Sequence, residues 1–361
     1  MPFLSFDSYP LWLNVFIFLL AAGTIWWAGT RLERYAGAIS EQTGLGQAFT
    51  GMLLLAAATS LPEIATTITA VALLNNPTLA VYNLVGGVAL QTGILVAADR
   101  TMRQRGALTY FTPQFVLLVE IVGLLFLLQL TIAAVSARGF PSIAGVSLWS
   151  VLIFVVYLGL MYLIYRSRGQ SRWTPIRADE ALPHEQPHAG DEQLQDQNPA
   201  DDERRSPKRL GLMFLGMSLI VLAGGWFATN TADQLANQTG LGHAFLGATL
   251  LALTTSLPEV STTVAASRHG RFSMAFSNIF GSNAFDISLL FLADLLYRGG
   301  TILEGAGSSA VFVAAVAAVM KCIYLWGLLE REDRVVLGIG WDSAAVVVVY
   351  VGAMTVLYFI G

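Results

Sequence analysis

The sequence predicts an all-α membrane protein with ten transmembrane helices, arranged as two inverted repeats of five helices each. Three observations support this: the apolar composition, the alternation of basic loops and a duplicated motif. Only 12% of the 361 residues are charged and 55% are hydrophobic, whereas a soluble domain carries about a quarter charged residues. The lipid bilayer is therefore the expected environment, and the net charge of -4 does not indicate a nucleic-acid partner.

Ten apolar segments are long enough, at about 20 residues each, to cross a bilayer as helices. We expect helices at roughly 10–30, 44–73, 78–98, 112–135, 143–165, 209–229, 240–267, 273–296, 308–329 and 336–360. The first has no basic start or small-residue cleavage site, so we expect it to be a retained membrane helix. Residues 166–208 have almost no large apolar side chains and are predicted to form a flexible linker. This linker separates the first repeat, 1–165, from the second, 209–361.

Lysine and arginine residues determine the expected orientation in the membrane. They cluster after the first, third, fifth, seventh and ninth predicted helices, whereas the alternate loops hold only Arg138 and Arg298. Cationic loops remain in the cytoplasm. We therefore expect a cytoplasmic linker, both termini outside, and a location in the cell (inner) membrane. The regular alternation also supports the count of ten helices.

A duplicated motif indicates the internal repeat. The block TGLGQAFTG starting at Thr43 matches TGLGHAFLG starting at Thr239, and ATSLPE ending at Glu63 matches TTSLPE ending at Glu259, all 196 residues apart. A second block follows, NLVGGVALQ in the first half and NIFGSNAFD in the second, at a spacing of 195 residues. Because each half has five helices, the second half must enter the membrane from the opposite side. Inverted repeats with interrupted helices are a recurring transporter architecture.

The two glutamates of this motif lie deep in predicted helices. Placing a carboxylate at such depth costs at least about 2.5–3.5 kcal/mol, so Glu63 and Glu259 need compensating partners. Hydroxyl side chains three and four residues earlier share their helix face, and Pro62 and Pro258 leave backbone carbonyls without a helical donor. These hydroxyls belong to Thr59, Ser60, Thr255 and Ser256. Such oxygen clusters bind hard cations like Ca²⁺, and no soft ligand that would favour copper or zinc is nearby.

The second block adds further polar groups. Ser282 and Asp286 are four residues apart and share a helix face, and Gln91 occupies the position that matches Asp286. The block also contains glycines at which helix backbones can approach closely. These are Gly86, Gly87 and Gly281.

The two Thr-Ser-Leu-Pro-Glu blocks, each followed by an Asn-x-x-Gly block, resemble the two alpha repeats of the calcium/cation antiporter superfamily, with the sodium/calcium exchangers as the nearest branch. The resemblance covers nearly the whole chain. It implies ion ligands from the side chains of Thr59, Ser60, Glu63, Thr255, Ser256, Glu259, Ser282 and Asp286 and from the carbonyls of Ala56 and Ala252. The chain departs from the family where Gly87 replaces a serine and Gln91 an asparagine. The missing hydroxyl is expected to affect a Na⁺ site more than the Ca²⁺ site.

The resemblance implies a secondary active antiporter that exchanges Ca²⁺ for Na⁺ as a monomer, with no cofactor and no enzymatic activity. A proton-coupled exchanger that uses the same glutamates is the alternative. An ion channel suits inverted repeats around buried charges less well, and no catalytic motif such as His-Glu-x-x-His indicates an intramembrane enzyme. When the site holds no ion, its unpaired charges should resist the occluded state, so only the ion-occupied protein can reorient across the membrane. The first and sixth helices, which lack the motif, are expected to slide against the rest of the protein to switch access.

Other buried charges have less certain roles. Glu120 and Lys321 could form an ion pair or extend toward the membrane surface, and we expect a structural role for both. Asp99 and Asp294 match in the repeat and lie near predicted helix ends. They are interpreted as interfacial acids, with a role in an ion vestibule as the alternative.

Overall fold

A computed structural model describes residues 5–43, 60–101, 106–112, 115–137, 141–143, 145–167, 206–268, 270 and 272–360. Within these residues eight helices are long and apolar enough to cross a membrane, and nine if one bent pair is counted as a single span. The chain is therefore a multi-pass membrane protein. Most of the predicted linker lies outside the described residues, and its two ends are the ends of helices.

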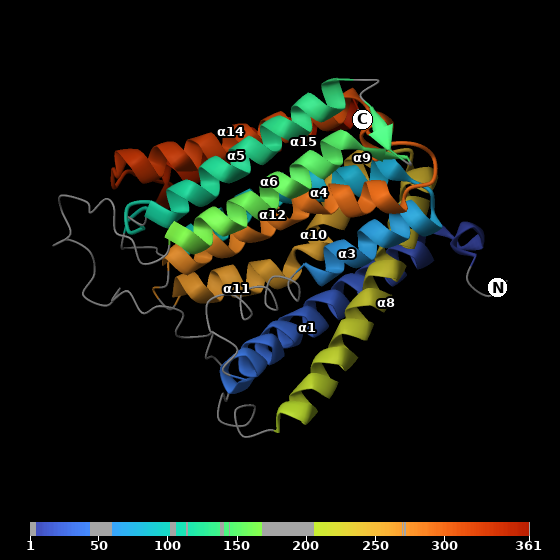
Figure 1. Ribbon diagram of the computed structural model, residues 1–361, viewed down its shortest axis with the longest axis horizontal. Helices are drawn as coiled ribbons and strands as arrows, with labels where there is room; N and C mark the ends of the chain where they lie inside the picture. The colour runs from blue at the N-terminus through green and yellow to red at the C-terminus, as the bar shows by residue number, and fades with distance from the viewer. Residues whose placement is uncertain are drawn as a thin grey trace.

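The first half consists of helices and one hairpin (Figure 1). After a short 3-10 turn, η2 (Phe6–Ser8), its elements are α1 (Leu11–Thr43), α3 (Leu61–Ile68), the π-helix η3 (Thr69–Leu73), α4 (Pro77–Arg100), α5 (Phe115–Ser136), β1 (Ser142–Ile143), β2 (Val146–Ser147) and α6 (Leu148–Ser167).

The second half contains the same long helices and a hairpin in the same order, with different short elements between them. Its elements are α8 (Pro207–Thr239), α9 (His243–Leu246), the π-helix η5 (Gly247–Leu251), α10 (Ala252–Thr255), α11 (Leu257–Arg268), α12 (Phe272–Leu296), α13 (Ile302–Gly305), α14 (Ser308–Glu330), β3 (Val335–Val336), β4 (Ile339–Gly340) and α15 (Trp341–Ile360). Both α1 and α8 are 33 residues long. A two-stranded hairpin precedes the last helix of each half.

Several predicted boundaries were wrong. The helices α1 and α8 continue about ten residues or more beyond their predicted ends at 30 and 229, because no proline stops them where the apolar run ends. The last helix of each half begins later than predicted, since the residues at 143 and 336 belong to the hairpins. In the second hairpin Leu337 and Gly338 both have positive φ angles, 53° and 80°, the type I′ geometry that joins two paired strands.

Local sequence explains where other helices begin and end. The side chain of Asn76 accepts a hydrogen bond of 3.0 Å from the backbone N–H of Leu79 and so caps α4, which starts with Pro77, a residue suited to the first helical position. At the C-terminal end of α8, Gly240 has a φ of 70° and terminates the helix. This left-handed conformation favours glycine.

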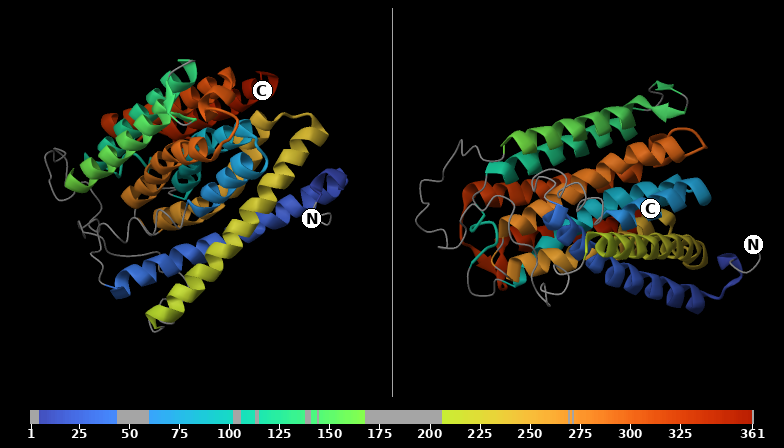
Figure 2. Two further views of the ribbon diagram at one scale, coloured as in Figure 1. Left: turned by 45° about the vertical axis from the view of Figure 1, so that its right-hand side comes forward. Right: turned by 60° about the horizontal axis from the view of Figure 1, so that its bottom comes forward.

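The helices α4 and α12 form the centre of the molecule. Their apolar windows are 83% and 67% buried, against 28% for α1 and 22% for α8. The pair α1 and α8 lie side by side along one flank and extend away from the other helices (Figures 1 and 2). The halves are thus interleaved, since each central helix comes from a different half.

Two matched aspartates join each half to the hairpin of the other. Asp99, at the end of α4, accepts hydrogen bonds from the backbone N–H groups of Leu108 (2.8 Å) and of Gly340 in β4. Asp294, at the end of α12, accepts from the N–H groups of Ile302 (2.7 Å) and of Ser147 in β2 (2.6 Å). The contacts are the same with the two halves exchanged. These bonds give both acids structural contacts at the ends of the two central helices.

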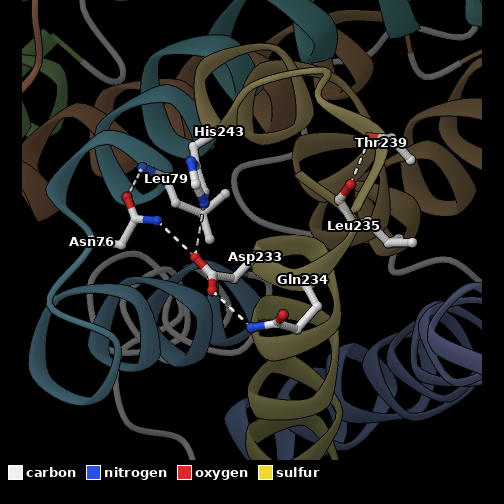
Figure 3. A network of polar contacts seen from close by, with 7 residues as sticks. All are labelled: Asn76, Leu79, Asp233, Gln234, Leu235, Thr239 and His243. Carbon is white, nitrogen blue, oxygen red and sulfur yellow. Dashed lines mark hydrogen bonds and ion pairs between the residues drawn. The ribbon is translucent and has the colours of Figure 1, made fainter. Parts of the chain in front are cut away.

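A further polar network ties the end of α8 to α4 and α9 (Figure 3). The carboxylate of Asp233 accepts a hydrogen bond of 2.8 Å from the capping residue Asn76 and one of 3.3 Å from Gln234. The Nε2 atom of His243 lies 3.1 Å from the same carboxylate. The helix α8 is therefore held at its C-terminal end, close to the start of α4.

Candidate functional site

The second copy of the motif breaks its helix. The segments His243–Thr255 and Leu257–Arg268 are inclined at 54° to each other, and Ser256 between them has ψ near 0° (2°). The helix predicted over 240–267 is therefore divided into two inclined segments. Pro258 cannot donate the helical hydrogen bond that would hold the two segments in line. The carbonyl of Ala252, one of the predicted ligands, accepts hydrogen bonds from the Thr255 hydroxyl (3.2 Å) and the Ser256 N–H (3.0 Å).

Glu63 lies in the first turn of α3 and is buried, with 2% of its surface exposed. Neither of its carboxylate oxygens has a hydrogen-bond partner among the described residues. Asp286 is close enough to interact with it electrostatically, and Thr255 lies beside it. Both neighbours come from the second half of the chain. A helix N-terminus favours negative charge, yet a buried carboxylate still needs a cationic partner.

Glu259 occupies the matching place in the first turn of α11 and is fully buried. Two serines, Ser60 and Ser256, immediately precede the two helix segments and are also fully buried. Neither serine hydroxyl has a hydrogen-bond partner in the part of the chain that the structure describes. The other predicted ligands of the first copy, Thr59 and Ala56, lie outside the described residues.

The second block forms a hydrogen-bonded triad between the two central helices. Gln91 of α4 donates from its amide to Asp286 (3.1 Å) and accepts from the hydroxyl of Ser282 (2.7 Å), both of α12. All three side chains are buried. The triad joins the two halves of the chain, and the Oδ1 atom of Asp286 has no hydrogen-bond partner among the residues described.

Among the described residues, one of the three glycines makes a close helix contact. A Cβ atom at Gly86 would lie 2.4 Å from the Cα of Ala248, so α4 rests on the π-helix η5 at this point. At Gly87 and Gly281 an added Cβ would meet no heavy atom of the described residues within 4 Å. Close approach is therefore confirmed at Gly86 and stays a prediction at the other two positions.

Two asparagines that begin the second block also make matched contacts. Asn83 of α4 donates a hydrogen bond of 3.0 Å to Thr66 of α3, and Asn278 of α12 donates one of 3.1 Å to Thr262 of α11. Sequence reasoning did not assign them a role, although their identity in both copies was the available signal. Asn283 was also missed; it is fully buried, and neither polar atom of its side chain has a partner in the described residues.

Four elements therefore surround the candidate site, α3 and α11 with the glutamates and α4 and α12 with the second block. Each of α3 and α11 packs against both α4 and α12. Within the described ranges, no three His, Cys, Asp or Glu side chains form a group that could hold a metal. The predicted ligands are mainly hydroxyl and carbonyl oxygens, and part of the first copy lies outside those ranges.

Two further charged residues lie within predicted helices, Lys321 and Glu120. Lys321 of α14 is fully buried, so the alternative in which it extends toward the membrane surface was wrong. Its ammonium donates hydrogen bonds to the carbonyl of Val88 (3.1 Å) and the hydroxyl of Thr92 (2.5 Å). Glu120 of α5 instead accepts from the hydroxyl of Ser277 at 2.9 Å.

Comparison with known proteins gives a consistent result. The sequence pattern of the family described as sodium/calcium exchanger protein matches residues 13–165 and 208–359, which together make up most of the chain. The chain is similar to the inner membrane protein YrbG of Escherichia coli strain K12, with 23% identity over 310 residues that cover 85% of this chain and 87% of that protein.

Two solved structures share the fold. The crystal structure of the H⁺/Ca²⁺ exchanger CAX matches with a TM-score of 0.65 and 14% identity over 96% of this chain and 85% of that one. The sodium-calcium exchanger NCX_Mj, soaked with 10 mM Na⁺ and 10 mM Sr²⁺, matches with a TM-score of 0.56 and 18% identity over 96% of this chain and 99% of that one.

Proposed function

Because the chain belongs to the sodium/calcium exchanger protein family, we propose that it is a secondary active antiporter that exchanges Ca²⁺ for Na⁺ by alternating access. The family consists of cation exchangers, which are transporters and not enzymes. The observation that carries the proposal is the matched burial of Glu63 and Glu259, each in the first turn of a helix segment at the same place in its half.

The chemistry around the two glutamates suits Ca²⁺ as the transported ion. Ca²⁺ binds six to eight oxygen ligands, and the proposed ligands are the two carboxylates with hydroxyl and carbonyl oxygens of the same motif. The Glu63 carboxylate and the hydroxyls of Ser60 and Ser256 are buried without hydrogen-bond partners among the described residues. Such groups are costly to bury, and coordination of a cation would offset that cost. We propose Thr59, Thr255, Ala56 and Ala252 as the remaining ligands nearest the glutamates.

We further propose that the chain crosses the membrane ten times as two inverted five-helix repeats. The equal lengths of α1 and α8, the matched hairpins and the exchanged contacts of Asp99 and Asp294 support this arrangement. The basic loops favour a cytoplasmic linker and both termini outside the inner membrane. A single copy of the chain holds both glutamates, so the proposed unit of transport is the monomer.

Alternating access would be produced by movement of α1 and α8. These two helices lie together on one flank, and their apolar windows are only 28% and 22% buried. Each touches the glutamate-bearing helix of the other half through a matched glycine: Gly29 approaches Pro258, and Gly225 approaches Ala65. Small residues at a helix contact allow two backbones to lie close together, which suits a sliding surface.

A proton-coupled exchanger is the second candidate, and one feature of the chain favours it. At the place where the family has a serine hydroxyl, this chain has Gly87, and Gln91 is already hydrogen-bonded to Ser282 and Asp286. Fewer oxygen atoms are therefore available for Na⁺ in the first half. The same two glutamates would carry protons in place of Na⁺.

Transport in reconstituted vesicles tests both candidates. The purified protein should accumulate Ca²⁺ when a Na⁺ gradient is imposed, and accumulation driven only by a pH gradient would establish the proton-coupled alternative. Glu63→Gln and Glu259→Gln should each abolish the flux, because each removes a charged ligand. Glu330→Gln, at the exposed end of α14, is the matched control and should transport normally. Near-normal flux in either motif variant would disprove the assignment of the site.

A further inference from the structure

Lys321 is the one buried cation that approaches the candidate site from a helix outside the four that form it, among the residues that the structure describes. It lies on α14, is 0% exposed, and points its ammonium toward α4, where it bonds to Val88 and Thr92. A buried ammonium is destabilising unless an opposite charge and further hydrogen bonds compensate it. The carbonyl and the hydroxyl supply the hydrogen bonds, and the opposite charge must come from a neighbouring acid.

That acid is Asp286. The Lys321 ammonium and the Asp286 carboxylate interact electrostatically, and both contact the same face of α4. Val88 and Thr92, the partners of Lys321, lie three residues before and one after Gln91, the partner of Asp286. Residues three and four apart share a helix face. Lys321 therefore lies beside the triad and close to the candidate site.

Charge counting shows what this placement does. Glu63, Glu259 and Asp286 carry a formal charge of minus three, and Glu63 and Asp286 interact electrostatically. With Lys321 included, the sum is minus two. In this sum Lys321 and Asp286 count together as zero, which leaves the charge of the two glutamates. One Ca²⁺ neutralises minus two completely, and so do two monovalent cations.

We propose that Lys321 is a tethered countercation that keeps the charge of the transport site at minus two, so that one Ca²⁺ exchanges for two monovalent cations and no net charge crosses the membrane. This inference rests on the proposed function and extends it to coupling. Asp286 is then the partner of Lys321 and does not require a transported cation of its own. A carboxylate without this lysine would need a third monovalent ion.

The test uses the full-length protein in vesicles whose membrane potential is set with K⁺ and valinomycin, driven by whichever monovalent gradient supports Ca²⁺ uptake. The wild-type Ca²⁺ accumulation ratio at steady state should not change with potential. Lys321→Gln returns the site to minus three, so exchange should move one net charge per cycle. The ratio should then change about 50-fold per 100 mV, which corresponds to about 2.3 kcal/mol per elementary charge.

Two further variants separate charge from packing. Lys321→Arg keeps the positive charge and should remain insensitive to potential, and Lys321→Gln combined with Asp286→Asn restores minus two and should regain insensitivity. A wild-type ratio that follows the potential overturns the proposal, and so does a transporting Lys321→Gln variant that ignores it. If Lys321→Gln does not fold, the potential dependence of the wild type and of Lys321→Arg tests the proposal. Absence of any Ca²⁺ exchange by the wild type would instead refute the proposed function.

Discussion

The side-chain amide of Gln91 donates a hydrogen bond of 3.1 Å to the carboxylate of Asp286, the residue that occupies the matching position in the other half of the chain. Two equivalent positions of an internal repeat can touch only where the halves meet. The contact therefore marks the interface between the halves at the centre of the molecule. It also joins unlike groups, a neutral amide and an acid, so the site is symmetric in position but not in chemistry.

Removal of this amide should destabilise the protein. Gln91→Leu has a similar size but leaves the Ser282 hydroxyl and one Asp286 oxygen buried without their partner. An unsatisfied buried polar group costs about 1–3 kcal/mol, so the temperature of unfolding in detergent should fall. Gln129→Leu, on the exposed side of α5, is the matched control and should unfold like the wild type. Equal unfolding temperatures for both variants would show that the triad contributes nothing to stability.

The adjacent glycines of α4 should respond in opposite ways to the same substitution. Gly87→Ser places a hydroxyl where an added Cβ meets no atom of the described residues within 4 Å. If Na⁺ is the counter-ion, this variant should lower the Na⁺ concentration needed for half-maximal Ca²⁺ exchange, because it supplies the missing oxygen. Gly86→Ser would press against the backbone of Ala248 at 2.4 Å, and overpacking of this kind costs about 1–3 kcal/mol.

Measured together, the two serine variants give a sharp result. Gly87→Ser should purify as a stable protein with altered Na⁺ dependence, whereas Gly86→Ser should show a lower unfolding temperature. An unchanged Na⁺ dependence in a well-folded Gly87→Ser variant would exclude this position from the binding of Na⁺.

The sequence predicts the helices and the repeated motif because length, apolarity and a duplicated block such as the one ending at Glu63 and Glu259 are local signals. The angle of the break at Ser256 was not predicted, because Pro258 removes a helical hydrogen bond but does not determine how far the two segments incline. The hairpin at Leu337 and Gly338 was missed because a two-residue turn is a weak signal within an apolar run. The neighbours of Lys321 depend on which face of α14 packs against α4, and no periodic pattern in the sequence specifies that.

The aspartates that hold the hairpins offer a test of structural against transport roles. Asp294→Ala removes the acceptor for the N–H groups of Ile302 and Ser147 and for the hydroxyl of Ser150. Hydrogen bonds to a charged group contribute about 1.5–3 kcal/mol each, so the variant should unfold at a clearly lower temperature. Its apparent affinity for Ca²⁺ at permissive temperature should stay unchanged. A stable protein with weakened Ca²⁺ affinity would favour the vestibule role.

The glycines on α1 and α8 should be sensitive to bulk if these helices move against the rest of the protein. At Gly29 an added Cβ would lie 2.6 Å from the Pro258 ring, and at the matching Gly225 it would lie 2.5 Å from the Cβ of Ala65. Valine at either position should shift the balance between inward-open and outward-open forms, since overpacking of about 1–3 kcal/mol falls on the state in which the contact is closest. A rise of about 1.4 kcal/mol in a barrier slows a step tenfold. Exchange should therefore slow by about tenfold or more, while equilibrium binding of Ca²⁺ to the detergent-solubilised protein persists.

Gly23→Val is the matched control, because Gly23 lies on the exposed side of α1 and an added Cβ there would meet no atom of the described residues within 4 Å. This variant should exchange at the wild-type rate. Equal rates for Gly23→Val and Gly29→Val would mean that the contact between Gly29 and Pro258 does not slide.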